Sequence, residues 1–104
     1  RVVAAPVSTQ LADGMACRIA EQAALDILAP HIDHIVQVTD QEVADAMRAL
    51  YRDTHNVAEG AGAAAFAAAM QERHALQGQT VGTTLCGGNV DSDVFARVLL
   101  SGTA

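Results

Sequence analysis

Apolar residues recur along the first third of the chain with two different periods, which predict a helix followed by a strand. The chain opens in an extended segment that is typical of a short strand. Residues 14–29 then carry apolar side chains at helical spacing, namely Met15, Ile19, Ala23, Ile27 and Leu28. Pro30 should end this helix at or before Ala29. Residues 34–39 alternate and are rich in β-branched side chains, which predicts a strand ending near Val38.

The middle of the chain predicts two helices in succession. Thr39 and Glu42 form a T-x-x-E capping box, which satisfies orphan amide donors at the start of a helix. The apolar face of that helix is carried by Val43, Met47, Leu50 and Tyr51. Residues 57–78 predict a second helix that has little side-chain bulk after Gly60 and Gly62. Another stretch of backbone can therefore approach this helix closely.

The last third of the chain predicts one more strand and one more helix. Residues 79–85 are typical of a strand, and the C-G-G-N segment at 86–89 forms its exit. Residues 91–100 predict a helix capped by Asp91 or Ser92. Its inward-facing side chains are Val94, Phe95, Val98 and Leu99. The resulting alternation of strands and helices indicates an α/β architecture with at least some parallel strands.

Composition argues against several classes of partner. The 104 residues are enough for one modest domain, or for a piece of a larger one. The formal net charge is −6, so the chain lacks the excess of basic residues that is typical of nucleic-acid binders. Neither nucleic acid nor an anionic membrane is therefore expected as a partner. The longest apolar run, residues 63–69, is far shorter than the roughly 20 residues that span a bilayer. We therefore expect a soluble, cytoplasmic protein.

The basic and sulfur-containing residues restrict the chemistry. All six basic residues are arginine, so a Schiff base to a carbonyl cofactor cannot be completed by this chain alone. Cys17 and Cys86 fit neither a CxxC pair nor a zinc ribbon, and both are expected to be thiols. The opening lacks an initiator methionine, which indicates that the chain is part of a longer protein.

Cys86 and Glu59 each allow two interpretations. Cys86 follows the strand predicted at 79–85 directly and precedes two glycines, which is where ligands bind in open α/β sheets. It is either a ligand contact or a buried thiol in a turn. Glu59 stands at the start of a helix. It either belongs to a site, or it interacts favourably with the helix dipole or serves as a plain cap.

The histidines offer little support for other sites. His31 and His34 have HxxH spacing, but Pro30 and the predicted strand disfavour an aligned pair of metal ligands, and no third ligand is evident. His55 and His74 lie near helix ends and are expected to be solvated. A protease is not expected, because the context of a nucleophilic serine or cysteine is missing.

Three segments together resemble a known family. They are LADGMACR at 11–18, VQVTDQEVADAMRALYRDTHNVAEGAGAAAFAA at 36–68 and VGTTLCGGNVD at 81–91. Their order and spacing are similar to the C-terminal portion of threonine/serine dehydratases, which are fold-type II pyridoxal-phosphate enzymes related to serine racemase. The resemblance runs from about residue 8 to residue 98. It implies that 1–104 is the C-terminal portion of a catalytic domain with a tryptophan synthase beta-like fold, a three-layer sandwich with a mostly parallel sheet.

The resemblance implies roles for six residues toward the cofactor pyridoxal 5'-phosphate (PLP). The residue at the position of Cys86 hydrogen-bonds the pyridine nitrogen in that family, and the backbone of Gly14 lies beside the ring. The others are Asp13 beside Gly14, Glu59 close to the ring, and Gly87 and Asn89, which shape the same pocket. A thiol cannot hold the pyridine nitrogen protonated as a carboxylate would, so the ring is a weaker electron sink. This favours β-elimination of L-threonine or L-serine, giving a 2-oxo acid and ammonia, over transamination.

The chain also departs from the family. The Schiff-base lysine, an asparagine beside the cofactor hydroxyl and a glycine-rich phosphate loop lie upstream in the family, and none is present here. The expected partners are therefore the missing N-terminal portion, an amino-acid substrate and further copies in a homo-oligomer. If Ala104 is the true terminus, the lack of a regulatory domain favours a short, catabolic type of enzyme. Serine racemase, another hydroxyamino-acid dehydratase and a non-catalytic structural or interaction fragment stay open as alternatives.

Overall fold

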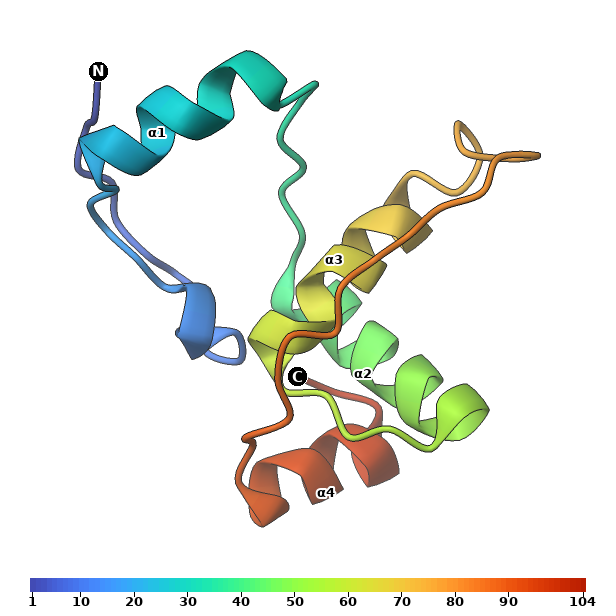
Figure 1. Ribbon diagram of the computed structural model, residues 1–104. Helices are drawn as coiled ribbons and strands as arrows, with labels where there is room; N and C mark the ends of the chain where they lie inside the picture. The colour runs from blue at the N-terminus through green and yellow to red at the C-terminus, as the bar shows by residue number, and fades with distance from the viewer.

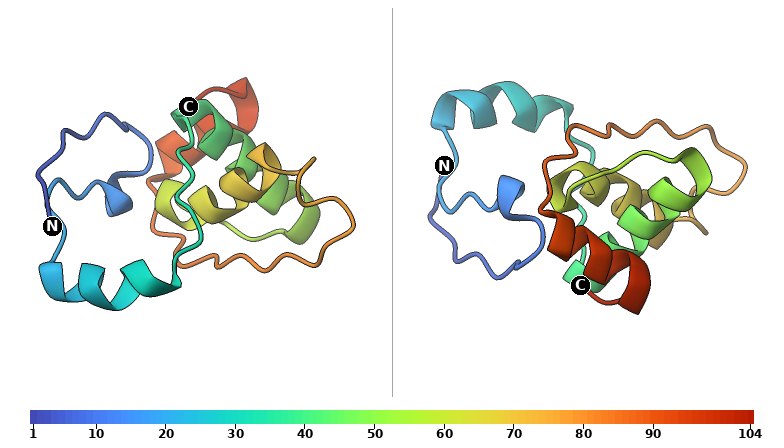
Figure 2. Two further views of the ribbon diagram at one scale, coloured as in Figure 1. Left: turned by 90° about the horizontal axis from the view of Figure 1, so that it is seen from above. Right: turned by 90° about the horizontal axis from the view of Figure 1, so that it is seen from below.

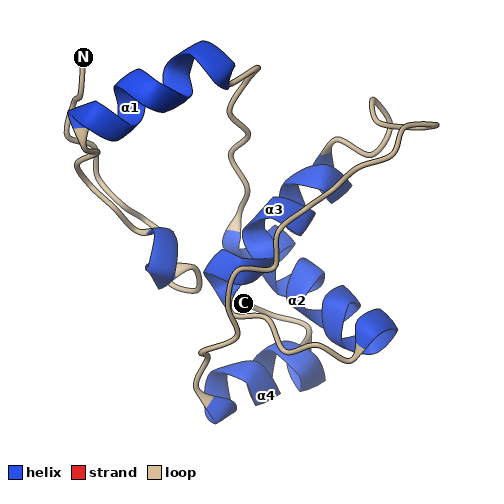
Figure 3. Cartoon of the chain, viewed as in Figure 1, coloured by secondary structure: helices blue, strands red, loops and turns tan.

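The computed structural model describes all 104 residues, and its only regular elements are helices. In chain order they are η1 (Asp13–Met15), α1 (Gln22–Leu28), η2 (Ala29–His31), α2 (Asp40–Thr54), α3 (Gly60–Gln71) and α4 (Ser92–Ser101). Figure 3 shows that the remaining residues are loops and turns. None of these helices combines the length and the apolar character needed to cross a membrane.

Helices α2, α3 and α4 pack together and form the core (Figure 1). The predicted capping box at the start of α2 is confirmed. The Thr39 amide donates to Glu42 Oε2 at 2.7 Å, and the Glu42 amide donates to Thr39 Oγ1 at 3.1 Å. Val43, Met47 and Val98 are the largest fully buried side chains of this core. The apolar face predicted for α2 is confirmed at Val43 and Met47, and Leu50 is half-buried. Tyr51 is 38% exposed and lies edge-on to Phe95, so its predicted inward position is wrong.

Helix α3 is narrow and ends earlier than its sequence pattern predicts. Its buried residues are all glycine or alanine: Gly60, Gly62, Ala63, Ala64 and Ala67. The expected end at Gly78 is wrong, because residues 72–78 form turns instead. The Arg73 guanidinium bonds the Met70 carbonyl at 2.8 Å, and Arg73, His74 and Ala75 are exposed. A helical turn that buries no face gains little from continuing.

Helix α1 stands apart from the three-helix core (Figure 2), whereas Leu11 lies in that core and η1 contacts α3. Among the helices, α1 contacts only the adjacent η2. The helix predicted over 14–29 is therefore too long at its start, since it begins at Gln22 and Ile19 is 67% exposed. Its end is confirmed, because α1 stops at Leu28, before Pro30. An amphipathic helix without a packing partner keeps only its most favourable turns.

The three predicted strands do not form in this chain, and the α/β expectation is wrong for these residues alone. Residues 33–38 and 80–86 make no hydrogen bond between backbone groups. In the opening segment, the Ala5 amide bonds the Arg18 carbonyl at 2.9 Å, without a ladder following it. The segments are nevertheless extended, and 81–86 runs along α3 in Figure 1. A strand needs a neighbour to receive its hydrogen bonds, and no segment of this chain serves as that neighbour.

Candidate functional site

Glycines bring three distant segments into backbone contact at the start of α3. The Glu59 amide donates a hydrogen bond to the Gly87 carbonyl at 3.1 Å. A Cβ atom built on Gly62 would lie 2.4 Å from the Gly87 carbonyl oxygen, and one built on Gly60 would lie 2.4 Å from the Leu11 carbonyl oxygen. The A-D-G and C-G-G-N segments therefore rest directly on the first turn of α3, from different sides.

The Glu59 carboxylate lies between two of these segments. A Cβ atom on Gly87 would lie 2.3 Å from Glu59 Oε1, and one on Gly14 would lie 3.4 Å from Glu59 Oε2. Glu59 is the N-cap residue of α3, yet its side chain makes no capping hydrogen bond. The interpretation of Glu59 as a plain cap is therefore wrong. Its carboxylate instead reaches the two glycine segments, and its position at the helix N-terminus still favours a negative charge there.

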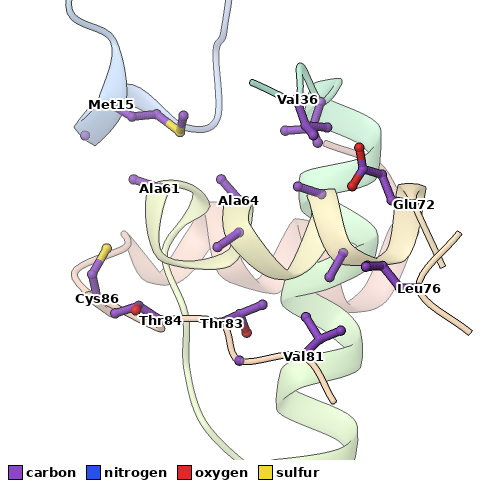
Figure 4. Close-up of a pocket in the computed structure, with 16 residues that line it drawn as sticks. Met15, Val36, Ala61, Ala64, Glu72, Leu76, Val81, Thr83, Thr84 and Cys86 are labelled. Atoms are coloured by element: carbon purple, nitrogen blue, oxygen red, sulfur yellow. The ribbon is translucent and has the colours of Figure 1, made fainter. Parts of the chain in front are cut away.

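Cys86 stands at one end of an apolar pocket beside α3 (Figure 4). The pocket has a volume of about 740 Å³, and the alanine methyl groups of α3, including those of Ala61 and Ala64, form one wall. In Figure 4, Met15 lies near the Cys86 end, and Glu72 lies at the opposite end. Cys86 is exposed, so the alternative of a buried thiol in a turn is wrong. Both cysteines are free, as predicted.

Five of the six residues proposed for the cofactor line two hollows, and Gly87 lines neither. Gly14 lines the pocket that contains Cys86. Asp13, Glu59 and Asn89 line a second hollow of about 370 Å³. Because Glu59 also reaches Gly14 and Gly87, these residues form the boundary between the two hollows. The structure thus places Cys86 and Gly14 in one pocket, and Asp13 and Asn89 on the other side of that boundary.

His34 connects an extended segment to the far end of the pocket. Its Nδ1 lies 2.6 Å from Asp33 Oδ2, and its Nε2 lies 2.7 Å from Glu72 Oε1. The hydrogen bond to Asp33, followed by that to Glu72, raises the pKa of His34. No three His, Cys, Asp or Glu side chains are grouped so that they could hold a metal ion. His55 and His74 are exposed, as expected.

The pocket fits the pyridine side of a cofactor better than its phosphate. Of its 16 lining residues, 11 are hydrophobic, which suits the face of a flat ring. The Cys86 thiol can exchange a weak hydrogen bond with a ring nitrogen. Glu72 is the one charged residue in the lining, so the pocket offers no cation to a phosphate. The residues present therefore fit one part of such a cofactor.

Gly62 is the site residue that the sequence motifs did not single out for a role. It touches the Gly87 backbone directly, while neither pocket is lined by it. The G-A-G spacing after Glu59 was the available signal, since it predicts close approach by another backbone. The sequence does not show which segment approaches.

Comparison with known proteins shows the family of this chain. A family described as pyridoxal-phosphate dependent enzyme matches residues 1–87. The L-threonine ammonia-lyase of Thermotoga maritima is 33% identical over 92 residues, which are 88% of this chain and 23% of that protein. The L-threonine ammonia-lyase of Geobacter sulfurreducens is 36% identical over 103 residues, which are 98% of this chain and 25% of that protein. A phenylserine dehydratase of Ralstonia pickettii is 37% identical over 90 residues, with coverages of 86% and 28%.

The chain spans about a quarter of the length of these curated relatives. The family match covers the A-D-G segment, the start of α3 and the segment that ends in Cys86 and Gly87. These are the segments that the structure brings together around Glu59. On both grounds, this chain belongs to the family of pyridoxal-phosphate dependent enzymes.

Proposed function

We propose that this chain forms the pyridine-side wall of the cofactor site in a hydroxyamino-acid dehydratase. The reaction would remove the β-hydroxyl group of L-threonine or L-serine and release a 2-oxo acid and ammonia. The supporting observation is the meeting of Gly14, Glu59 and Gly87 beside the exposed Cys86 thiol. The relatives named as threonine ammonia-lyases and as a phenylserine dehydratase support a β-hydroxyamino acid as the substrate.

Cys86 would tune the reaction through the pyridine nitrogen. PLP, when bound, withdraws electrons from the substrate so that the Cα proton and a β-substituent can be removed. A thiol beside the ring nitrogen is a weak hydrogen-bonding partner and, unlike a carboxylate, does not hold a proton there. Cys86 would therefore keep the ring a moderate electron sink, and departure of the β-hydroxyl would outrun other outcomes.

The glycines and Glu59 would shape the edges of the ring site. Gly14 and Gly87 carry no side chains, so the backbone on either side of the Glu59 carboxylate can approach a ring closely. The alanine-lined wall of α3 would exclude water from one face. Asp13 and Asn89 line the adjoining hollow and would orient polar groups at its border.

The rest of the protein would complete both the site and the sheet. The chain has no lysine, and the pocket has no cation, so the Schiff-base and phosphate contacts would come from the portion that this chain does not span. The unpaired segments 33–38 and 80–86 would join strands of that portion in a mostly parallel sheet. Ile35 is 81% exposed and Val81 is 46% exposed, and this union would bury them. A cytoplasmic homo-oligomer is part of the same proposal.

The test uses the holoenzyme, meaning this chain joined to the portion of the catalytic protein that it does not span and loaded with PLP. The expected result is a cofactor absorbance band, together with equal amounts of ammonia and 2-oxo acid from L-threonine or L-serine. The complementary portion without this chain is the control and should release neither product. A holoenzyme that binds PLP but forms no 2-oxo acid from any β-hydroxyamino acid would overturn the proposed reaction. One that binds no PLP would support a non-catalytic role.

Racemisation is a second candidate, because a serine racemase of Schizosaccharomyces pombe is 29% identical over 86% of this chain. The two reactions differ in their products. Chiral chromatography of a reaction with L-serine would show D-serine from a racemase, and pyruvate with ammonia from a dehydratase. D-serine formation faster than ammonia release would favour the racemase.

A further inference from the structure

Gly62 lies against the residue that follows the Cys86 thiol. A Cβ atom on Gly62 would come within 2.4 Å of the Gly87 carbonyl oxygen, 3.1 Å of its amide nitrogen and 3.3 Å of its carbonyl carbon. All three are backbone atoms, which cannot swing aside as the end of a flexible side chain can. We infer that Gly62 is a positioning residue that sets the place of the Cys86 thiol through Gly87, and this inference rests on the proposed function.

Backbone conformation does not explain why residue 62 is glycine. The glycines with positive φ are Gly78 and Gly102, so Gly62 has ordinary helical geometry. Glycine within a helix weakens it relative to alanine. Alanine occupies the next three positions of α3, where a methyl group is accommodated. The close approach of Gly87 is therefore the structural reason for a glycine at this position.

Helix α3 cannot easily retreat from a larger residue at position 62. On another side of the same turn, a Cβ atom on Gly60 would lie 2.4 Å from the Leu11 carbonyl oxygen. The Glu59 amide also bonds the Gly87 carbonyl at 3.1 Å. A methyl group on Gly62 would break this arrangement by pushing Gly87 outward. Cys86 is joined covalently to Gly87 and would move with it.

Two alanine variants of the holoenzyme separate positioning from general destabilisation. Gly62→Ala adds a methyl group against the Gly87 backbone. Met47→Ala destabilises the buried core, and Met47 lines neither hollow of the site. Both are made in a Cys17→Ser background, so that Cys86 is the single thiol of this chain. Leu100→Ala serves as a third variant, because Leu100 is 88% exposed and lines neither hollow.

The first measurement is the rate at which iodoacetamide alkylates Cys86 with and without PLP, followed by mass spectrometry. In the parent protein, the bound cofactor is expected to shield the thiol. Gly62→Ala should lose about ten-fold or more of this protection, because access governs thiol reactivity. Met47→Ala and Leu100→Ala should keep it within about two-fold. Equal loss in Met47→Ala and Gly62→Ala, or full protection in Gly62→Ala, would overturn the inference.

The second measurement is the absorbance maximum of bound PLP, which reports the surroundings of its ring. It should shift in Gly62→Ala in the same direction as in Cys86→Ala, and it should stay in place in Met47→Ala. A shift in Cys86→Ala without one in Gly62→Ala would overturn the inference about Gly62 and leave the proposed function standing. Absence of any shift in Cys86→Ala would overturn the proposed function itself.

If Gly62→Ala does not fold, a crystal structure of the parent holoenzyme decides the matter. The Gly87 carbonyl oxygen should lie in van der Waals contact with Gly62 Cα, within about 4.5 Å. It should also accept the Glu59 amide hydrogen bond, within about 3.2 Å. A Gly87 segment that lies away from α3 in that structure would overturn the inference.

Discussion

The amide of Glu59 and the carbonyl of Gly87 form a backbone hydrogen bond of 3.1 Å that ties the start of α3 to the segment carrying Cys86. Because both groups belong to the main chain, the contact does not depend on the side chain at position 86. The hydrogen bond between Glu59 and Gly87 should therefore persist when Cys86 is replaced. Substitution at this position then probes the chemistry of the side chain rather than the fold.

Cys86→Ser should retain elimination in the holoenzyme, whereas Cys86→Asp should lower kcat for L-threonine by about ten-fold or more. A serine hydroxyl resembles the thiol as a neutral partner of the ring nitrogen, but a carboxylate would hold a proton there. The measurement is steady-state release of 2-oxo acid. Cys17→Ser is the matched control and should match the parent, since Cys17 is a free thiol outside the Cys86 pocket. Equal activity of the Ser and Asp variants would contradict the electronic argument.

His34 should titrate above the ordinary pKa of histidine, because Asp33 and Glu72 both hydrogen-bond its ring. A raised pKa means that this contact stabilises the fold fully below the ordinary pKa, about 6.5, and that its contribution is lost as the pH rises through the higher folded-state value. NMR of ring-labelled histidine would measure the titration. Asp33→Asn should lower the pKa of His34 more than Glu72→Gln, since Asp33 is the larger cause. No change in either variant would show that the contacts are absent in solution.

Glu42 should make the protein sensitive to acid. The Thr39 amide, followed by the Gln71 side chain, lowers the pKa of Glu42. A lowered pKa means that the contribution to stability is present above the ordinary pKa, about 4.3, and is lost as the pH falls through the folded-state value. In urea unfolding between about pH 5 and pH 3, the parent should lose stability more steeply than Glu42→Gln. Gln71→Ala should give an intermediate slope, and identical slopes in all three proteins would count against the capping box as the cause.

Met47→Ala should lower the free energy of unfolding by about 2–5 kcal/mol. Met47 is fully buried between the three packed helices, so the truncation would leave a cavity as well as remove apolar contacts. Urea denaturation of the holoenzyme, followed by circular dichroism, would measure the change. Leu100→Ala removes a side chain of the same class that is 88% exposed, and its effect should stay within about 0.5 kcal/mol. Equal effects of the two substitutions would show that Met47 does not belong to the hydrophobic core.

The candidate site was predictable from the sequence in its parts but not in its arrangement. The motifs identified Cys86, Gly14 and Glu59, and the structure brings their segments together. The motifs did not separate Asp13 and Asn89 from Cys86, although the structure places them in different hollows. Nor did they show that Gly62 faces Gly87. These relationships depend on how α3 packs against loops that are distant in sequence.

Features whose cause is local could be predicted from the amino-acid sequence. Thr39 and Glu42 start α2 because a capping box needs only three residues of spacing. Pro30 ends α1 because it has no amide hydrogen to donate to the helix, although Ala29 before it keeps helical angles and the chain continues in η2. Tertiary structure alone decided whether residues 33–38 and 80–86 became strands, how far α1 extended, and where α3 ended. A strand receives its hydrogen bonds from another segment, and an amphipathic helix gains most of its stability from the surface it covers. Where this chain contains no such partner, the local pattern is present but the element does not form.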